Sequence, residues 1–408
     1  MIITNTPVTA TENLKYLPDE IRPIFVDIET TGLSPRTAAI YLIGVSDGIT
    51  VTQWMAEDLT EECNVIQAFK DYLLSHEDYT LIHFNGQRFD LPFIKKRADK
   101  YLITFHFDEM PQIDLFKEIR QYRKILSLNA VNQKAIEGFL GITREDCYDG
   151  GRLIRVYMDA AYSDDKSGLD LCLLHNLEDV QGMPGLLSML AYKQLYDLTA
   201  ADGELSILKD TATPAGSPHQ ESCADSEGSP DPEGISRQEA TARAYIHFRL
   251  TLPLPVAIKK ADSTGQIILS ASGNEVTLTI PVFQGVLKRF YNDYKNYWYL
   301  PDTDECIHKS MASFVDASRR VKCDKEHCYT KANGLFLMQS GAIEPVFSFS
   351  TESELNYIAL TPAARECTSN HEAAAPLPLF DAIGGLAEAW LSDTLSQFLG
   401  AHCKAHST

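Results

Sequence analysis

The chain has 408 residues, an apolar fraction of 44% and a formal net charge of −20 at pH 7. This length favours two globular units joined by a connector, and the apolar fraction provides for a sizeable core. The negative charge argues against a protein that coats nucleic acid through basic contacts, but it is compatible with an enzyme that grips one strand end at a metal site.

Three strands and a helix are predicted first. Residues 24–33 are an apolar, β-branched run typical of a strand, and residues 39–45 and 50–54 follow it after short turns. Residues 57–75 carry apolar side chains at helical spacing. The order predicts a β-meander followed by a helix.

A fourth strand is predicted at residues 79–84, and Asp90-Leu91-Pro92 after it predicts a helix start with Asp90 as the N-cap. Further helices are predicted at residues 114–122, 128–140 and 155–162. A long helical stretch follows at residues 170–197. Gly182, Pro184 and Gly185 interrupt it, which predicts a bend or two helices.

Residues 203–236 are predicted to be a disordered, acidic linker between a first domain, 1–202, and a second domain, 237–408. The linker is rich in Pro, Ser and Gly, and it cannot bury enough surface to fold. Strands are predicted beyond it at residues 245–252, 256–260, 266–270, 276–282, 334–338 and 345–350, with turns at 262–265 and 272–274 and helices at 309–320 and 383–399. The second domain is therefore expected to be a β-rich α+β fold of unknown function.

The sequence also bears on location and redox state. No apolar run approaches 18 residues and residues 1–15 lack a secretory pattern, so we expect a cytoplasmic protein without a membrane partner. The nine cysteines are odd in number and irregularly spaced, which indicates reduced thiols rather than a disulfide framework.

The first chemical motif is Asp27-Ile28-Glu29 within the first predicted strand. Strand side chains alternate, so both carboxylates leave the same face, about 6.6 Å apart along the chain. Like charges held together in a partly dry site need a proton or a cation, and oxygen ligands favour Mg²⁺ or Mn²⁺. Taken alone, the pair also fits an edge strand with two solvated acids.

Two further motifs follow at Asp90 and at His175-Asn176-Leu177-Glu178-Asp179. A carboxylate where a strand turns into a helix is well placed to meet ligands from the neighbouring strand. On a helix, His175 and Asp179 lie on one face, about 6 Å apart. Taken alone, Asp90 fits an ordinary N-cap, and His175 with Asp179 fits a pair on a helix surface.

Together, and in this order, the three motifs resemble the signature of the DEDD exonuclease superfamily. The segments Asp27–Leu33, Phe84–Gly86 with Phe89–Pro92, and His175–Val180 are similar to the YprB-type family of predicted 3′–5′ exonucleases. The resemblance covers residues 20–200 and implies an α/β fold, a ribonuclease-H-like mixed sheet flanked by helices.

The resemblance implies that Asp27, Glu29, Asp90 and Asp179 hold two divalent cations, Mg²⁺ or Mn²⁺, for phosphodiester hydrolysis by a two-metal mechanism. His175 stands four residues before Asp179, where the superfamily has either Tyr four residues back or His five residues back. A general-base role suits imidazole near neutral pH. Its reach differs from both standard arrangements.

The resemblance also implies substrate contacts from Thr30, Leu33, Asn85 and Phe89. Leu33 resembles an apolar wedge between terminal bases, Phe89 is expected to stack on a base, and Asn85 to bond a sugar or phosphate. Ordinary turn packing is the alternative for these residues. The cluster Lys95-Lys96-Arg97 with Lys100 fits a phosphate track or a solvated helix face, and Asp114 resembles a recurrent Asp of the family.

Two patterns of the second domain remain open. Residues 290–299 hold six aromatic side chains beside Lys288 and Arg289, which fits a stacking platform for single strands, a core strand or a protein interface. Cys323 and Cys328, with Cys306 and His308 upstream, have zinc ligand types. Their spacing is unusual, and it favours reduced thiols over a zinc site.

The sequence therefore predicts a metal-dependent 3′–5′ exonuclease that acts on single-stranded DNA or RNA ends. One alternative is a degenerate nuclease fold that binds nucleic acid or protein, with a protein partner recruited by the second domain. The four intact acids argue against it. An endonuclease for structured nucleic acid is the other alternative.

Overall fold

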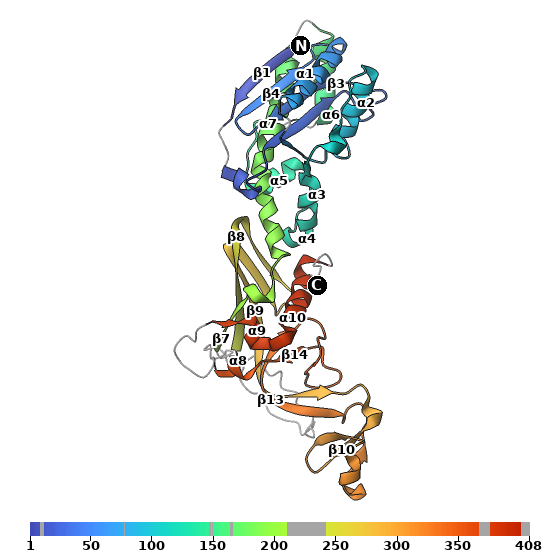
Figure 1. The fold of residues 1–408 in the computed structure, drawn as a ribbon, viewed down its shortest axis with the longest axis vertical. Coiled ribbons are helices and arrows are strands. Elements are labelled where there is room, and N and C mark those ends of the chain that lie inside the picture. The colour runs from blue at the N-terminus through green and yellow to red at the C-terminus, as the bar shows by residue number, and fades with distance from the viewer. Residues whose placement is uncertain are drawn as a thin grey trace, which may run out of the picture. The chain divides into compact units, whose positions relative to one another are not determined.

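The structure is a computed structural model that describes residues 1–8, 12–76, 78–146, 148, 150–163, 166–209, 242–366 and 376–400. The chain forms two compact units. Unit 1 comprises residues 1–193 with 252–256, and unit 2 comprises residues 194–251 with 257–408 (Figure 1). In the described part of the chain, no helix has the length and apolar character needed to cross a membrane.

Unit 1 is built on a six-stranded mixed sheet. The strands in spatial order are β1 (Ile2–Pro7), β4 (Thr50–Met55), β3 (Ile40–Ser46), β2 (Pro23–Thr30), β5 (Thr80–His83) and β6 (Gln112–Asp114). The pairs from β1 to β2 are antiparallel, whereas β2–β5 and β5–β6 are parallel. The predicted meander is confirmed, and β1 is an edge strand that the sequence pattern did not indicate.

Helices cover both faces of this sheet (Figure 1). On one face α1 (Glu62–Leu74) and α2 (Asp90–Lys100) pack against Ile24, Val26 and Ile28 of β2. On the other face α6 (Gly150–Ala161) and α7 (Ser167–Leu186) pack against β3 and β4. Because strand side chains alternate, the odd-numbered residues of β2 face α7. The predicted α/β fold with flanking helices is confirmed.

The remaining helices of unit 1 are short. They are the 3₁₀ helices η1 (Glu12–Tyr16), η2 (Leu59–Glu61), η3 (Phe107–Glu109) and η4 (Arg120–Tyr122), and the α-helices α3 (Leu115–Ile119), α4 (Arg123–Leu126) and α5 (Gln133–Leu140), with η5 (Leu187–Leu195) extending beyond residue 193.

Several predicted helix boundaries are wrong. The helix predicted at 128–140 begins at Gln133, because the side chain of Asn132 accepts the backbone N–H of Ala135 and caps it. The helix predicted at 155–162 begins at Gly150. Helix α7 continues through Pro184 to Leu186 and passes into η5, so the predicted interruption lies later than expected.

Unit 2 contains a second six-stranded sheet and a small three-stranded one. The larger has the order β14 (Asn356–Ala359), β13 (Tyr329–Gln339), β9 (Ile268–Phe290), β8 (Ala242–Ala261), β7 (Glu204–Lys209) and β15 (Leu377–Pro378), and the smaller has the order β11 (Glu305–His308), β10 (Tyr297–Leu300) and β12 (Val321–Lys322). Its helices are η6 (Ala200–Asp202), η7 (Tyr294–Asn296), η8 (Ala312–Phe314), η9 (Ala317–Arg319), α8 (Pro362–Glu366), α9 (Leu379–Ile383), η10 (Gly384–Leu386) and α10 (Ala387–Leu399). The predicted β-rich second region is confirmed.

Details of unit 2 differ from the predictions. The four strands predicted between 245 and 282 are two long ones, β8 and β9, and the turn predicted at 272–274 lies inside β9, where Gly273 has a φ of +55°. The helix predicted at 309–320 is reduced to η8 and η9. Residues 345–350 make isolated β-bridges rather than a strand.

The linker also begins later than expected. Residues 204–209 of the predicted linker form β7, which pairs with β8. Residues 210–236, the rest of the predicted linker, lie outside the described residues.

Candidate functional site

Strand β2 presents two carboxylates to helix α7. Asp27 and Glu29 lie near the carboxyl end of β2. This strand pairs antiparallel with β3 on one side and parallel with β5 on the other. Glu29 is buried and Asp27 is half-buried. The two carboxylates, which the strand period places on one face, therefore face helix α7 rather than solvent.

A glycine lets α7 approach the sheet closely. A Cβ atom on Gly44 of β3 would lie 2.0 Å from Oδ1 of Asn176 on α7, which is a severe overlap. The fully buried Asn176 donates from Nδ2 to Oδ2 of Asp27 at 3.0 Å, and its own Oδ1 accepts from Nε2 of Gln53 at 2.9 Å. Gly44, Gln53 and Asn176 thus fix the carboxylate of Asp27.

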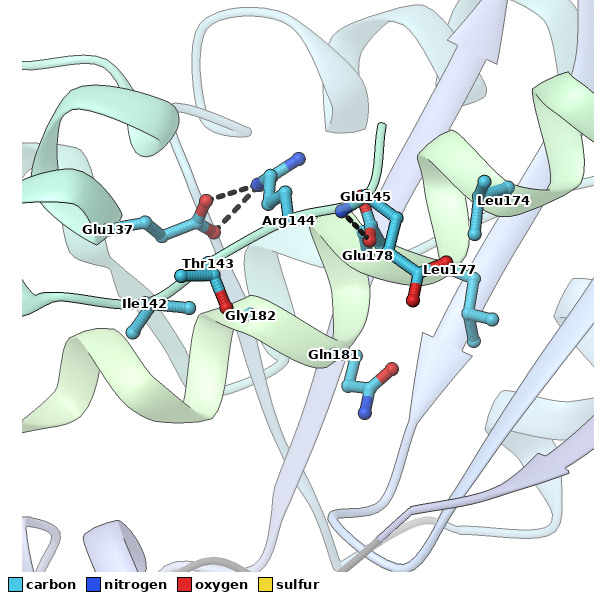
Figure 2. A pocket seen from close by; sticks show the side chains of 10 residues that line it. All are labelled: Glu137, Ile142, Thr143, Arg144, Glu145, Leu174, Leu177, Glu178, Gln181 and Gly182. Carbon is cyan, nitrogen blue, oxygen red and sulfur yellow. Dashed lines mark hydrogen bonds and ion pairs between the residues drawn. The ribbon is translucent and has the colours of Figure 1, made fainter. Parts of the chain in front are cut away.

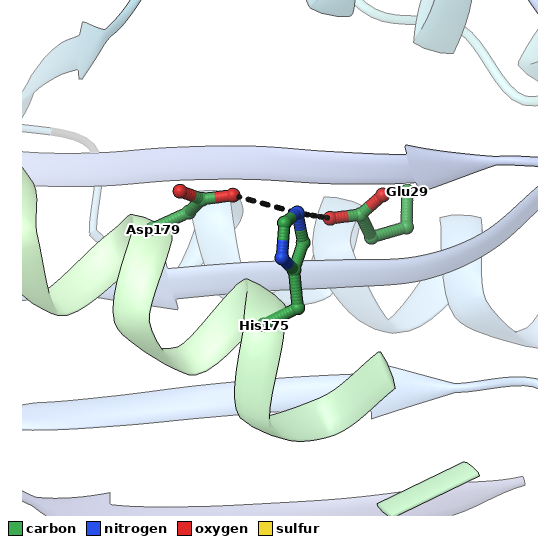
Figure 3. A group of neighbouring side chains, drawn as sticks. All are labelled: Glu29, His175 and Asp179. Atoms are coloured by element: carbon green, nitrogen blue, oxygen red, sulfur yellow. Dashed lines mark ion pairs between the residues drawn. The ribbon is translucent and has the colours of Figure 1, made fainter. Parts of the chain in front are cut away.

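His175 lies between the acids of the strand and of the helix. Its Nε2 atom is 3.5 Å from Oε1 of Glu29 and 3.2 Å from Oδ2 of Asp179, as Figure 3 shows. His175 is buried, and the i, i+4 spacing places it on the same face of α7 as Asp179. The structure therefore brings together Glu29, His175 and Asp179 as a group able to hold a cation.

The other nitrogen of His175 contacts a carboxylate that the sequence analysis missed. Nδ1 of His175 lies 2.6 Å from Oδ2 of Asp146. Burial opposes ionisation of Asp146, but hydrogen bonds from Lys134, from the backbone N–H of Tyr148 and from His175 hold its pKa below the usual range. An ionised carboxylate only accepts hydrogen bonds, so Nδ1 carries a proton, and in the neutral imidazole Nε2 is then the acceptor that faces Glu29 and Asp179.

The loop that carries Asp146 is tied to α7 and α5. Glu178 of α7 accepts the backbone N–H groups of Glu145 and Asp146 at 2.7 and 2.9 Å. Arg144 pairs with Glu137 of α5, and its Nη1 lies 2.6 Å from Oδ1 of Asp179. Figure 2 shows the contacts of Arg144 with Glu137 and of Glu145 with Glu178, which lie beside a cavity of about 510 Å³ next to α7. The position of Asp146 is thus set by contacts outside the acidic group.

Asp90 joins the group electrostatically. Burial is the main reason that the pKa of Asp90 is raised to about 7; the hydrogen bond from its own backbone N–H opposes the increase, and the charges of Asp114 and Asp179 contribute to it. Asp90 is the first residue of α2, whose N-cap is Phe89, so the predicted N-cap role of Asp90 is wrong. Asp114 is an N-cap itself, because its Oδ1 accepts from Phe116 and Lys117 at the start of α3.

The four predicted acids repel one another. Burial is the largest cause of the raised pKa of Asp27 and of Glu29, and the charges of Asp179 and Asp90 raise both values further. A set of clustered oxygen donors with one imidazole suits a hard divalent cation, which would offset this repulsion. The donor set therefore fits Mg²⁺ or Mn²⁺ held by Asp27, Glu29, Asp90 and Asp179.

The four predicted substrate residues have different surroundings. The hydroxyl of buried Thr30 donates to the carbonyl of Gly32 at 2.9 Å, which fixes the turn after β2. Leu33 is 85% exposed. Asn85 has a φ of +65°, and its N–H donates to Oδ1 of Asp114 at 2.9 Å. Phe89 is half-buried with its ring centroid 5.4 Å from that of Phe93.

The basic cluster on α2 is smaller than its sequence suggests. Arg97 is buried and donates from Nε to Oε1 of Glu62 at 2.7 Å, so it does not belong to an exposed phosphate track. Lys95 is exposed and lies 3.4 Å from Asp108. Only the lysines of this cluster are therefore available for a phosphate track on α2.

Asp146, Asn176, Gln53 and Arg144 are the site residues that the sequence analysis missed. Asn176 lies within the recognised motif, where its position beside His175 was the available signal. Asp146 and Arg144 come from a loop without periodicity, and Gln53 comes from a strand read only as apolar. Their roles depend on the fold.

Comparison with known proteins bears on unit 1. Residues 24–191 match the family model of the RNase_H superfamily. Unit 1 therefore contains a ribonuclease-H-like fold, and the match supports a hydrolase that acts on nucleic acid. No curated protein matches the chain.

Among solved structures, the chain is similar to the family B DNA polymerase from the hyperthermophilic archaeon Pyrobaculum calidifontis. The sequence identity is 16% and the TM-score is 0.37. The match covers 45% of this chain and 26% of the polymerase chain, so the chain spans about a quarter of that protein's length.

Proposed function

We propose that unit 1 is a metal-dependent 3′–5′ exonuclease of the YprB type that hydrolyses single-stranded DNA or RNA ends. The observation that carries the proposal is the position of His175 Nε2, within 3.5 Å of Glu29 and 3.2 Å of Asp179. A proton acceptor thus lies among the carboxylates that fit divalent cations.

The residues divide into two roles. Asp27, Glu29, Asp90 and Asp179 hold two divalent cations, Mg²⁺ or Mn²⁺. When bound, the cations stabilise charge on the phosphate and lower the pKa of the attacking water. His175 accepts the proton of that water at Nε2, and Asp146 keeps the required tautomer through Nδ1.

Cation binding requires a local rearrangement. Asp179 pairs with Arg144 through Oδ1 and with His175 through Oδ2, and both contacts occupy oxygens that a cation would use. Arg144 has a second carboxylate partner in Glu137, so it can leave Asp179 without losing all its ion pairs. Leu33, exposed after β2, and Asn85 with Phe89, before Asp90, are the proposed contacts to the strand end.

The test compares three single-stranded substrates of the same sequence with Mn²⁺ present: one with a free 3′ end, one with a blocked 3′ end and one that is circular. We expect mononucleotides from the first substrate alone. Asp27→Asn and Asp179→Asn should abolish their release, and Asp159→Asn on the exposed side of α6 is the matched control.

Two results contradict the proposal in different ways. Cleavage of the circular substrate indicates an endonuclease. Absence of divalent-ion binding by calorimetry, with undiminished nucleic-acid binding, indicates a binding module on a nuclease fold. Full activity of Asp27→Asn refutes the assigned site directly.

A further inference from the structure

An insertion in unit 2 has a core made of cysteines. Residues 291–328 connect the end of β9 to the start of β13 and include the small sheet of β10, β11 and β12. All residues of this segment are described, and its buried residues are Cys306, Ala312, Cys323 and Cys328. The segment contains no buried Leu, Ile, Val or Phe to hold its short strands together.

A segment of this size needs another source of stability. Domains below about 40 residues bury too little apolar surface to fold without a disulfide, a metal or an oligomer. The strands β10, β11 and β12 are also short, with four, four and two residues. A cross-link inside the cysteine cluster would supply the missing stability.

The three thiols come from different parts of the insertion. Cys306 lies on β11, Cys323 follows β12, and Cys328 immediately precedes β13. They pack together, with Tyr291, Tyr294, Tyr297 and Tyr299 around them. Burial is the main reason that the pKa of Cys306 is raised to about 11, and the neighbouring Cys323 contributes to the increase. Three thiols cannot all be satisfied by one disulfide.

A histidine borders the same cluster. His308 lies two residues after Cys306 on β11, so strand alternation places both on one face. Tyr297, which packs against the thiols, also contacts the ring of His308, with centroids 5.3 Å apart. Nδ1 of His308 lies 2.8 Å from Oγ of Ser310 and accepts the backbone N–H of Ser310 at 3.3 Å, and these contacts orient the ring.

His327 is the less suitable histidine. It is adjacent to Cys328 in the chain, and its Nδ1 atom pairs with Asp324 at 2.8 Å. Both histidines are exposed, and the ring of His327 lies 5.3 Å from that of Tyr299, but no strand alternation places His327 on the same face as a cysteine. His327 therefore serves as a control for His308.

We propose that Cys306, Cys323, Cys328 and His308 bind one Zn²⁺ ion that stabilises the insertion. Three cysteines with one histidine form a common structural zinc set, and thiolates select zinc over the hard cations that suit unit 1. Zinc binds cysteines as thiolates, so binding releases the thiol protons. The sequence analysis favoured reduced thiols because the spacing is unusual. The structure packs the three cysteines together regardless of that spacing.

The experiment uses the full chain, purified and then incubated with Zn²⁺ or Co²⁺. We expect about one equivalent of tightly bound zinc by mass spectrometry, and thiolate-to-cobalt charge-transfer bands in the ultraviolet. Asp179→Asn should keep both signals, because they belong to unit 2. Cys328→Ser and His308→Gln should weaken zinc binding strongly, His308→Cys should retain it, and His327→Gln should match the wild-type protein.

A measurement on the wild-type chain covers the case in which Cys328→Ser does not fold. Zinc should protect Cys306, Cys323 and Cys328 from alkylation, a chelator should expose them, and Cys63 should react equally in both states. Zinc that is lost in Asp179→Asn but kept in Cys328→Ser overturns the proposal. A disulfide between two of the three cysteines, or alkylation that zinc does not affect, also overturns it. Unchanged binding in His308→Gln refutes the fourth ligand.

Discussion

The contact between Asp146 and His175 makes a sharp prediction about catalysis. In Asp146→Asn one carboxylate oxygen becomes an NH₂ group. Oδ2 of Asp146 faces two donors, Nδ1 of His175 and Nζ of Lys134, and Oδ1 accepts the N–H of Tyr148. The amide therefore has to direct its NH₂ group at a donor in either orientation.

The unfavourable contact changes the tautomer of His175. If the NH₂ group faces Nδ1, the imidazole moves its proton to Nε2, and the lone pair facing Glu29 and Asp179 is lost. General-base action is worth about 10²–10⁴ in rate, and loss of a supporting partner about 10–100-fold. We expect kcat to fall about 100-fold, which corresponds to about 2.7 kcal/mol, with little change in KM.

The assay is the shortening of a 5′-labelled single strand, measured under multiple-turnover conditions at varied substrate concentration with saturating Mn²⁺. A double-mutant cycle with His175→Gln isolates the coupling between the two residues. Because Asp146 acts through His175, adding Asp146→Asn to His175→Gln should cost no further activity. Lys134→Gln removes the other partner of Oδ2 and should have a smaller effect.

Two outcomes refute this reasoning. A kcat within about threefold of the wild-type value would mean that the tautomer of His175 is not set by Asp146. Fully additive losses in the double mutant would mean that Asp146 acts on the structure of the loop instead. Asp159→Asn, an exposed carboxylate on α6, controls for the loss of one negative charge.

Three predictions concern stability, each measured by urea unfolding. Gly44→Ala should destabilise unit 1 by about 2–3 kcal/mol and reduce activity, because the new Cβ displaces Asn176. Gly138→Ala is the control: no atom lies within 4 Å of the new Cβ, so this variant should be neutral or stabilising. Asp27→Asn should stabilise the metal-free protein at pH 7 by about 1–2 kcal/mol, because the raised folded-state pKa makes the charged carboxylate unfavourable at that pH. The gain in stability should shrink as the pH falls and Asp27 of the wild-type protein becomes protonated. A loss of stability of Asp27→Asn in EDTA contradicts this prediction. Glu62→Gln should lower the free energy of unfolding by about 3 kcal/mol, because the charge of Arg97 loses its partner. Burial opposes ionisation of Glu62, but hydrogen bonds from Arg97 and Tyr101 lower its pKa, so the stability that Glu62 provides is present above about pH 4.3 and is lost as the pH falls through the folded-state pKa. Equal stability of Glu62→Gln and the wild-type protein at pH 7 refutes the pairing.

The sheet of unit 1 could be predicted where the signal is local. Strands β2, β3 and β5 are fully or almost fully buried, and they appear in the sequence as apolar runs between turn residues. Strand β1 could not be found this way, because it contains no buried residue and alternates only between half-buried and exposed. Its partner β4 defines it, and pairing between residues about 50 positions apart leaves no local pattern.

The long strands of unit 2 show the opposite error. Separate strands were predicted at 245–252 and 256–260, on either side of Pro253 and Pro255, and a turn was predicted at 272–274, which contains Gly273; each of these three residues weakens a strand. In the structure β8 and β9 continue through these positions, and each has a neighbouring strand on both sides in the sheet. Tertiary pairing therefore overrides the local preference.

The positions of the four acids and of His175, the proposed base, were predictable to different degrees. Asp27, Glu29 and Asp179 are placed by the strand and helix periods, and those periods can be read from the sequence. The reach of His175 was open, because a His stands where the resembled family has Tyr. In the structure, the i, i+4 spacing on α7 places Nε2 of His175 3.2 Å from Oδ2 of Asp179, so the side chain reaches the acidic group.

The protonation of His175 depends on a loop rather than on the motif. Asp146 is 29 residues away in sequence, and it reaches Nδ1 only because Glu178 holds the loop backbone against α7. Glu178 lies in the same motif as His175 and Asp179, three residues after His175 and beside it on the helix surface. The motif therefore contributes twice, once through side chains that face the acids and once through a carboxylate that places the partner of the base. A change at Glu178 should consequently alter catalysis without touching the acidic group.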